Sequence, residues 1–269
     1  MRQSRTVACA SSLLLATAYV LAGPATARAA APPAITGYVA LGDSYSSGVG
    51  AGDYLAEGAG CKRSSRAYPA LWAQTHRTAS FAFLACNGAR TKDVLSGQIG
   101  ALGPRTRLVT LTVGGSDAGF AAAMAACALG GTTPCMFALA GARSTVDGPL
   151  AADLDRLYSA IRYRAPAARV VVLGYPHLYR LHGTCRIGLP DSVRAAVNDA
   201  VDHLDEMIAK RAADHGFAFA DVRAAFAGHE ICSPHPWLRS VDLMALTESY
   251  HPTAPGQSLG YLPVLNRNY

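Results

Sequence analysis

Five short apolar runs alternate with longer stretches of helical spacing, and this alternation limits the chain to a small set of folds. The runs are rich in β-branched and aromatic residues, which favours buried strands. They lie at 38–42 (YVALG), 81–86 (FAFLAC), 107–113 (RLVTLTV), 169–174 (RVVVLG) and 217–222 (FAFADV). Neighbouring parallel strands need crossover connections, which helices supply. We therefore predict an α/β fold, a three-layer α/β/α sandwich around a mostly parallel five-stranded sheet.

The segments between these runs carry apolar residues at helical spacing. The segment at 190–215 begins with Pro-Asp-Ser, a common signal for the start of a helix. A second long helical segment spans about 137 to 164, and Pro149 predicts a kink or a break inside it. Shorter helices are expected before the second and third strands.

The first 31 residues have the parts of a secretory signal peptide. A basic start (MRQSR) precedes an apolar run (SSLLLATAYVLA) and a small-residue segment (ATARAA). The apolar run is too short to span a bilayer core of about 30 Å. We therefore predict a leader at 1–31 that is removed on export, and a single domain at 32–269. The protein is expected to be secreted and extracellular.

The charge of the chain argues against a nucleic-acid partner. The sequence has 24 basic and 18 acidic residues, a formal net charge of +6, and three of the arginines lie in the leader. The other basic residues are scattered, with no Lys/Arg block among them. Nucleic-acid binding is therefore excluded from the expected functions.

Six cysteines follow the leader, and an even number in an exported chain predicts disulfides. Counting alone leaves their pairing open. The short spacing of Cys127 and Cys135 favours a local bridge, and sequential pairing of the rest predicts Cys61–Cys86 and Cys185–Cys232. A metal site is the weaker alternative, because the chain has no CxxC or HxxxH spacing.

Three glycine-bearing loops follow the first three strands. They are GDSYSSG at 42–48, NGART at 87–91 and GGSDAG at 114–119. The carboxyl ends of parallel strands share one edge of the sheet, so these loops are expected to meet there. Glycines let the backbone turn with its amides exposed, and exposed amides are what an oxyanion needs from its surroundings.

Ser44, in the first of these loops, is a candidate nucleophile. A serine hydroxyl is a weak nucleophile unless a base, almost always histidine, lies within hydrogen-bond reach. His251 in TESYHPTAPGQ is the best candidate, because it lies in a Pro- and Gly-rich loop before a short closing helix. His235 in SPHPW is its one serious rival. The alternative role for Ser44 is a helix N-cap, a position that serine favours.

These residues resemble the SGNH, or GDSL, hydrolase family, above all its secreted actinomycete lipases and esterases. GDSYSSG is similar to the first family block, which makes Ser44 the nucleophile and an oxyanion donor. CNGAR is similar to the second block, with Gly88 as an oxyanion donor, and HPTAPGQ is similar to the last, with His251 as base. The resemblance covers the whole mature chain. It implies hydrolysis of carboxylic esters through an acyl-serine, without metal or cofactor.

Two positions depart from the family pattern. The third block is usually Gly-Gly-Asn-Asp, and here Ser116 replaces the asparagine whose side chain donates to the oxyanion. Loss of one such donor lowers the rate by about 10²–10³. The family commonly has Asp three residues before the histidine, where this chain has Glu248. The main-chain carbonyl of Ser249 is the alternative group to orient His251, and it is the one we favour.

Three functions remain open at this point. The favoured one is a secreted carboxylester hydrolase acting on lipid or other acyl esters. The second is a polysaccharide O-deacetylase of the same family, and the third is a hydrolase-like binding protein with a weakened oxyanion hole. We expect a monomer that takes a small-molecule or lipid ester and has at most transient contact with a lipid surface.

Several other residues have two interpretations. Asp43 is expected to be structural, bonding loop amides as Asx-turns do, rather than catalytic. Tyr45, Phe120 and Trp237 are candidates for the wall of an acyl pocket, although an aromatic residue is more often part of the core. GVGAG at 48–52 does not match the dinucleotide pattern GxGxxG, so no nucleotide is expected.

Overall fold

The structure is a computed structural model that describes residues 37–185 and 188–269. The leader predicted at 1–31 lies outside the described residues. Among the helices in the described ranges, none combines the length and the apolar character that a membrane crossing requires.

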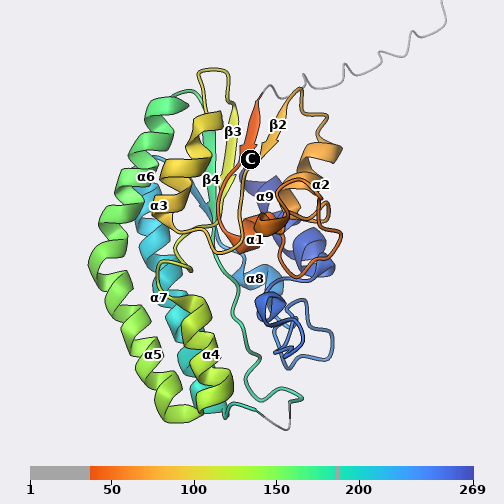
Figure 1. Ribbon diagram of the computed structural model, residues 1–269, viewed down its shortest axis with the longest axis vertical. Helices are drawn as coiled ribbons and strands as arrows, with labels where there is room; N and C mark the ends of the chain where they lie inside the picture. Colours follow the sequence, from red (N-terminus) through yellow and green to blue (C-terminus); the bar gives the residue numbers. More distant parts are fainter. Residues whose placement is uncertain (1–36, 186–187) are drawn as a thin grey trace, which may run out of the picture. The chain divides into compact units, whose positions relative to one another are not determined.

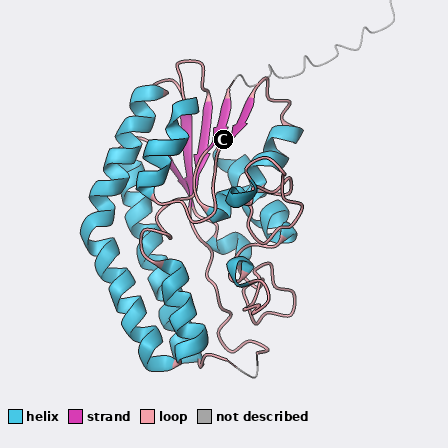
Figure 2. Cartoon of the chain, viewed as in Figure 1, coloured by secondary structure: helices cyan, strands magenta, loops and turns pink. Residues whose placement is uncertain are grey.

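A five-stranded parallel sheet lies at the centre of the described chain (Figures 1 and 2). The order of its strands is β2-β1-β3-β4-β5, and every pair of neighbours is parallel. The strands are β1 (Tyr38–Ala40), β2 (Phe81–Phe83), β3 (Leu108–Leu111), β4 (Arg169–Leu173) and β5 (Ala218–Ala220). Each lies inside one of the predicted runs, so the predicted α/β fold is confirmed.

The strand order creates a crevice beyond the carboxyl end of β1. The chain passes from β1 to β2 on one side and then returns to β3 on the other, so the connections diverge at this point. In open parallel sheets, ligands bind where the strand order reverses in this way. The residues of β1 and β3 are buried throughout, whereas those of the edge strand β2 are half-buried.

Helices cover the sheet and continue beyond it. They are α1 (Ser44–Ser47), α2 (Tyr68–Thr75), α3 (Thr91–Asp93), α4 (Phe120–Gly130), α5 (Thr132–Thr145), α6 (Ala151–Arg164), α7 (Asp191–Asp214), α8 (Arg223–Phe226) and α9 (Leu262–Asn268). In Figure 1, α3, α6 and α7 lie on one side of the sheet and α2 and α9 on the other. Both α7 and α9 contact β4 and β5.

The helices differ from the sequence prediction at α4 and at the start of α5, and agree with it at the kink near Pro149. The sequence did not predict α4, because its residues, FAAAMAACALG, are almost uniformly apolar and show no helical period. The helix α5 also begins earlier than predicted, at Thr132 rather than near 137. The predicted kink is present, since Gly148 has non-helical dihedral angles, φ −104° and ψ −106°, next to Pro149 between α5 and α6.

Three disulfides join the six cysteines of the described chain. The pairs are Cys61–Cys86, Cys127–Cys135 and Cys185–Cys232, which is the sequential pairing. The first bridge ties the segment before α2 to the loop after β2. The second joins α4 to α5, and the third joins the segment before α7 to the segment after α8.

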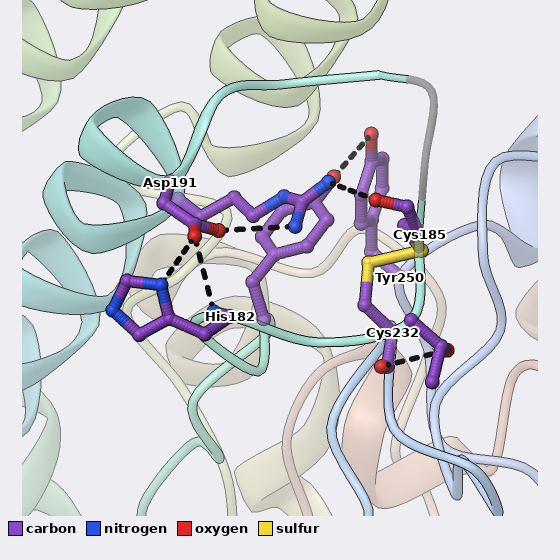
Figure 3. Close-up of a disulfide and its surroundings, with 8 residues drawn as sticks. His182, Cys185, Asp191, Cys232 and Tyr250 are labelled. Carbon is purple, nitrogen blue, oxygen red and sulfur yellow. Dashed lines mark hydrogen bonds and ion pairs between the residues drawn. A yellow bond between two sulfur atoms is a disulfide. The ribbon is translucent and has the colours of Figure 1, made fainter.

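The Cys185–Cys232 bridge lies beside a polar cluster at the start of α7 (Figure 3). Asp191 accepts a hydrogen bond from the backbone amide of His182 at 3.1 Å and pairs with Arg194 at 3.1 Å. Arg194 also donates to the carbonyl of Cys185 at 3.4 Å. The bridge and the cluster together hold the chain that enters α7.

The Cys185–Cys232 bridge should stabilise the fold more than the Cys127–Cys135 bridge. The two bridges span sequence separations of 47 and 8 residues. Loop-closure entropy then gives about 4 and about 2.5 kcal/mol of stabilisation, respectively. We expect Cys185→Ala/Cys232→Ala to lower the free energy of unfolding by about 1.5 kcal/mol more than Cys127→Ala/Cys135→Ala does. Urea denaturation measures both, and the reverse order would contradict the expectation.

Candidate active site

The carboxyl ends of the first three strands bring the predicted loops together. The carbonyl of Gly42 accepts a hydrogen bond from the amide of Cys86 at 3.0 Å, and the amide of Asp43 donates to the carbonyl of Thr112 at 3.0 Å. Gly42 has φ +118°, and a Cβ there would lie 2.4 Å from the Thr112 carbonyl oxygen. Only glycine therefore lets the chain leave β1 this close to the loop after β3.

Ser44 is the first residue of α1, but it is not the cap of that helix. Asp43 caps it, since its side-chain Oδ1 accepts from the amide of Tyr45 at 3.0 Å. The hydroxyl of Ser44 meets a different group. Its Oγ lies 2.8 Å from Nε2 of His251, 207 residues further along the chain. The predicted nucleophile and base are thus in direct contact.

The second ring nitrogen of His251 fixes where the ring carries its proton. Nδ1 lies 2.9 Å from the main-chain carbonyl oxygen of Ser249. Because a carbonyl oxygen only accepts, Nδ1 carries the proton, and Nε2 presents a lone pair to the hydroxyl of Ser44. A serine in this contact can lose its proton to the ring as its oxygen attacks a carbonyl carbon.

A turn at Tyr250 places the Ser249 carbonyl against the ring. Tyr250 has φ +66°, a left-handed conformation that is uncommon outside glycine. The hydroxyl of Tyr45 donates to the carbonyl of Tyr250 at 2.7 Å. On the other side, the carbonyl of Arg239 accepts from the amide of Tyr250 at 2.8 Å, and the amide of Arg239 donates to the carbonyl of His251 at 2.9 Å. These bonds hold the turn from both sides.

Glu248, the other group considered for orienting the imidazole, is engaged elsewhere. Its carboxylate accepts a hydrogen bond from the hydroxyl of Tyr54 at 2.8 Å. It also pairs with Lys62 and with Arg239, each at 3.5 Å. Of the two alternatives, the structure places the Ser249 carbonyl on the ring nitrogen.

Burial lowers the pKa of His251 to about 4. The main cause is the loss of hydration that the charged imidazolium would suffer, while the hydrogen bond to the Ser249 carbonyl acts in the opposite direction. Lys62 contributes a smaller lowering. His251 is therefore neutral, with its Nε2 lone pair available, at pH values where an ordinary histidine is largely charged.

The carboxylate of Asp43 holds the loop that carries Ser44. It is 2% exposed and accepts hydrogen bonds from the amide of Tyr45 at 3.0 Å, the hydroxyl of Thr112 at 2.6 Å and the hydroxyl of Tyr175 at 2.5 Å. Burial raises the pKa of Asp43 to about 6, and these donors limit the rise. The carboxyl group is therefore ionised at neutral pH and bonds loop amides and hydroxyls, as expected for a structural residue.

Tyr175 connects two of the three loops through one oxygen atom. Its hydroxyl donates to Asp43 and accepts a hydrogen bond from the amide of Gly115 at 3.1 Å. Gly115 directly precedes Ser116 in the loop after β3. The sequence analysis did not single out Tyr175, which follows β4 and lies 132 residues from Asp43.

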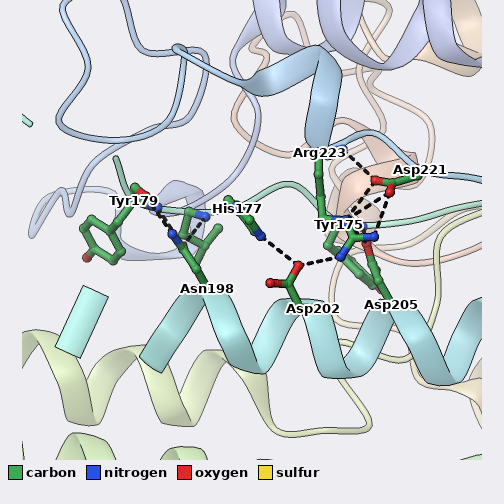
Figure 4. Close-up of polar contacts among 9 residues, drawn as sticks. Tyr175, His177, Tyr179, Asn198, Asp202, Asp205, Asp221 and Arg223 are labelled. Carbon is green, nitrogen blue, oxygen red and sulfur yellow. Dashed lines mark hydrogen bonds and ion pairs between the residues drawn. The ribbon is translucent and has the colours of Figure 1, made fainter. Parts of the chain in front are cut away.

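Polar residues on α7 hold the segment that carries Tyr175 (Figure 4). The fully buried carboxylate of Asp205 accepts from the backbone amide of Tyr175 at 3.0 and 3.1 Å. Asn198, two turns earlier on α7, accepts from the amide of Tyr179 at 3.1 Å and donates to its carbonyl at 2.8 Å. The extended chain after β4 is thereby fixed against the helix at two points.

The three predicted oxyanion donors line one cleft. Ser44, Gly88 and Ser116 all border it, as does His251. Gly88 has φ +74°, a glycine conformation, and its amide donates to no acceptor among the described residues. The amide of Ser44 is in the first turn of α1, where amides have no partner within the helix. Asn87 also borders this cleft, and the sequence analysis did not predict it.

The cleft has a volume of about 420 Å³, and much of its lining is apolar. Val241, Leu246 and Tyr250 border it near His251. One wall comes from α4, through Phe120, Ala121, Met124, Ala125, Ala128 and Leu129. Of this wall the sequence analysis singled out Phe120 alone, because it had not predicted α4.

Three residues considered earlier as the base or as the wall of an acyl pocket do not line the cleft: His235, Trp237 and Tyr45. His235, the rival base, is exposed, and its carbonyl accepts a hydrogen bond from the ring of His229 at 2.8 Å. Trp237 stacks on His229, with ring centroids 3.6 Å apart, and packs against Phe226. No group of metal-ligating side chains occurs within the ranges 37–185 and 188–269.

Comparison with known proteins gives matches over nearly the whole chain. The sequence model of the GDSL-like Lipase/Acylhydrolase family matches residues 40–259. The chain is 56% identical over 266 residues to Lipase 1 of Streptomyces coelicolor and 55% identical over 266 residues to a lipase of Streptomyces rimosus, with 99% of both partners covered in each case.

Two solved structures are similar in fold as well as in sequence. The extracellular lipase of Streptomyces rimosus has a TM-score of 0.85 at 56% identity, covering 87% of this chain and 100% of that one. Phospholipase A1 of Streptomyces albidoflavus has a TM-score of 0.86 at 54% identity, covering 88% of this chain and 100% of that one.

The imidazole of His251 should titrate near pH 4 in the folded protein, because burial lowers its pKa to about that value. The unfolded chain takes up the same proton near pH 6.5. The stability linked to this group is therefore present above about pH 6.5 and is lost as the pH falls from there toward 4. The ring chemical shifts in an NMR titration measure the folded-state pKa. A value near 6.5 would contradict the expectation.

Tyr175→Phe should slow the reaction of Ser44 with a fluorophosphonate probe by about 10- to 100-fold, since small displacements of a reacting group have effects of this size. The change removes a donor from Asp43 and the acceptor of the Gly115 amide. Tyr158→Phe is the matched control, because the hydroxyl of Tyr158 is buried without a hydrogen-bond partner among the described residues. A normal labelling rate in Tyr175→Phe would contradict the role of this bridge.

Proposed function

The chain belongs to the GDSL-like lipase/acylhydrolase family and is a carboxylic ester hydrolase, and we propose that it cleaves lipid esters through an acyl-enzyme on Ser44. The observation that carries the proposal is the 2.8 Å contact between Ser44 Oγ and His251 Nε2. Burial keeps that imidazole neutral, with its pKa at about 4, so that it can accept a proton.

In the first half of the proposed reaction, Ser44 attacks the ester. Its Oγ bonds to the carbonyl carbon while Nε2 of His251 takes the hydroxyl proton, and the carbonyl electron pair moves onto oxygen. When this tetrahedral intermediate collapses, the bond to the alcohol oxygen breaks. His251 gives its proton to that oxygen, and the alcohol departs. The acyl group remains bonded to Ser44 Oγ as an acyl-serine.

In the second half, water takes the place of the alcohol. His251 accepts a proton from the water as the water oxygen bonds to the acyl carbon. The second tetrahedral intermediate releases the acid when its bond to Ser44 Oγ breaks, and His251 returns the proton to Oγ. The enzyme is then in its starting state.

The backbone amides of Ser44 and Gly88 are the proposed donors to the negative oxygen of both intermediates. Their place along the cleft supports this role. Ser116 is proposed as a third donor through its hydroxyl. Its side chain is shorter than the asparagine common in the family, so it reaches less far, and one missing donor costs about 10²–10³ in rate.

The carbonyl of Ser249 is proposed to orient His251 in place of a carboxylate. A carbonyl is uncharged, so it stabilises the transient imidazolium less than an aspartate would. The weaker stabilisation of the imidazolium makes protonated His251 a stronger acid. Return of its proton to the departing oxygen is therefore favoured. The buried ring thus acts as a moderate base and an effective acid.

Lipid esters are the proposed substrates, because an apolar helix borders the cleft at Ser44. The two similar structures compared above are a lipase and a phospholipase A1, which supports the same class. The deacetylase alternative is not favoured, since an acetyl group would leave most of this apolar wall without contact. The binding-protein alternative is not favoured either, because serine and histidine are in hydrogen-bond contact.

We propose that the enzyme works outside the cell as a monomer. The leader sequence at 1–31 supports export. The three disulfides are typical of proteins from oxidising compartments. One similar structure is described as an extracellular lipase.

Ser44→Ala and His251→Ala should each lower the rate of p-nitrophenyl ester hydrolysis by at least about 10³-fold, because nucleophile and base act as one unit. Melting curves should show that both variants fold. His235→Ala is the control and should retain its activity, since His235 is exposed and outside the cleft. Retention of more than a few per cent of activity by either site variant would overturn the assignment.

Glu248→Gln separates the two ways of orienting His251. If the Ser249 carbonyl does so, this variant should keep its turnover within a few fold of the original enzyme. A loss comparable to that of His251→Ala would show that the carboxylate is required.

A further inference from the structure

We propose that Phe120 limits the length of the acyl chain that the enzyme accepts, by separating the cleft at Ser44 from an apolar cavity between α4, α5 and α7. This inference rests on the proposed function, because it places the acyl part of the ester along α4. It concerns chain length only. It can therefore fail while ester hydrolysis at Ser44 stands.

Three hollows meet at the first residue of α4. The cleft runs along this helix. A smaller hollow lies among the loops after β1, β3 and β4, where Ser44, Gly115 and Tyr175 border it. A third, with a cavity volume of about 50 Å³, lies between α4, α5 and α7. Of the residues that the structure describes, Phe120 alone lines all three.

The cavity behind Phe120 has the chemistry of a hydrocarbon site. Its polar side chains are Arg143 and His203, and the ring of His203 bonds to Asp147 at 2.6 Å. The rest of the lining is apolar and includes Ala123, Met124, Leu139, Val197, Val201 and Leu204. Filling an apolar cavity with hydrocarbon is more favourable in free energy than filling it with water, because water finds few hydrogen-bond partners there. The acyl chain of an ester is hydrocarbon that begins at the carbonyl carbon attacked by Ser44.

Several contacts fix the position of Phe120. Its backbone amide donates to the carbonyl of Gly115 at 3.0 Å, which starts α4 directly behind the Ser116 loop. Its ring is edge-on to Tyr45 and to Tyr250, with centroid distances of 6.5 and 6.4 Å. These tyrosines belong to α1 and to the turn before His251. The ring therefore lies beside the reacting residues and also borders the cavity, and Met124, one turn further along α4, borders both the cleft and the cavity as well.

This position has a direct consequence for substrates. A chain that leaves the carbonyl at Ser44 and follows α4 meets the ring of Phe120 before it reaches the cavity. Carbons beyond that point stay in the open cleft and remain partly hydrated. Removal of the ring would join the cleft to the cavity, so that more methylene groups could be buried.

The test is a chain-length profile of Phe120→Ala, measured as kcat/KM for p-nitrophenyl esters from butyrate to palmitate, all dispersed in the same detergent. The optimum should move to longer chains, with about fourfold gained for each methylene group newly buried. The ratio of kcat/KM for palmitate to kcat/KM for butyrate should rise by at least about tenfold, because burial of two further methylene groups is enough for a change of this size.

Phe137→Ala is the matched control. Phe137 lies on the neighbouring helix α5, is 83% exposed and borders none of the three hollows. Phe137→Ala makes the same change of side chain as Phe120→Ala and should not alter the chain-length profile. Refilling the cavity is the second control: Phe120→Ala/Ala200→Phe should lose the gain for long chains, because Ala200 lines the cavity and not the cleft.

Phe120→Trp keeps the test decisive even if the alanine variant folds poorly. The larger ring should move the optimum toward shorter chains. The inference is overturned if neither substitution moves the profile, or if both lower the hydrolysis of every ester by the same factor, as a purely structural role of Phe120 predicts. Wild-type hydrolysis of butyrate that depends on Ser44 would still support the proposed function in that case.

Discussion

The hydrogen bonds to the buried carboxylate of Asp43 are the constraint on which the site depends. An ionised group at 2% exposure is stable only when its oxygens are well bonded, and here the donors come from three different loops. One donor follows β1, one follows β3 and one follows β4. The need to satisfy a single buried charge therefore fixes the relative positions of three segments that are far apart in the sequence.

The placement of the reacting groups follows from this constraint. The loop that Asp43 holds carries Ser44 at the start of α1, and the hydroxyl of Tyr45 in the same helix holds the turn that carries His251. Nucleophile and base are thus positioned by adjacent residues of one short helix. Their contact needs no carboxylate on the histidine, because the positive φ of Tyr250 turns the Ser249 carbonyl onto Nδ1.

The sequence predicts those features that depend on local signals. The β-branched runs locate all five strands, and the loops with their glycines locate Ser44, Gly88 and His251. It does not predict α4, since a uniformly apolar stretch has no period, and the apolar wall of the cleft is missed with it. Nor does it reveal Tyr175, because nothing near a tyrosine after β4 indicates that its hydroxyl reaches Asp43. The choice between Glu248 and Ser249 likewise depends on one backbone angle, at a tyrosine where the sequence has no glycine to signal it.

The most direct test of this account is to trap the acyl-enzyme. The protein is mixed with a p-nitrophenyl ester, quenched in acid within the first turnovers and digested, and the peptides are identified by mass spectrometry. The account predicts one acyl group per chain, on Ser44, and a matching burst of p-nitrophenol if deacylation is slower than acylation. An acyl group on another residue would contradict it. So would turnover by a direct attack of water, shown by single-turnover data in which no acyl-enzyme forms at any time.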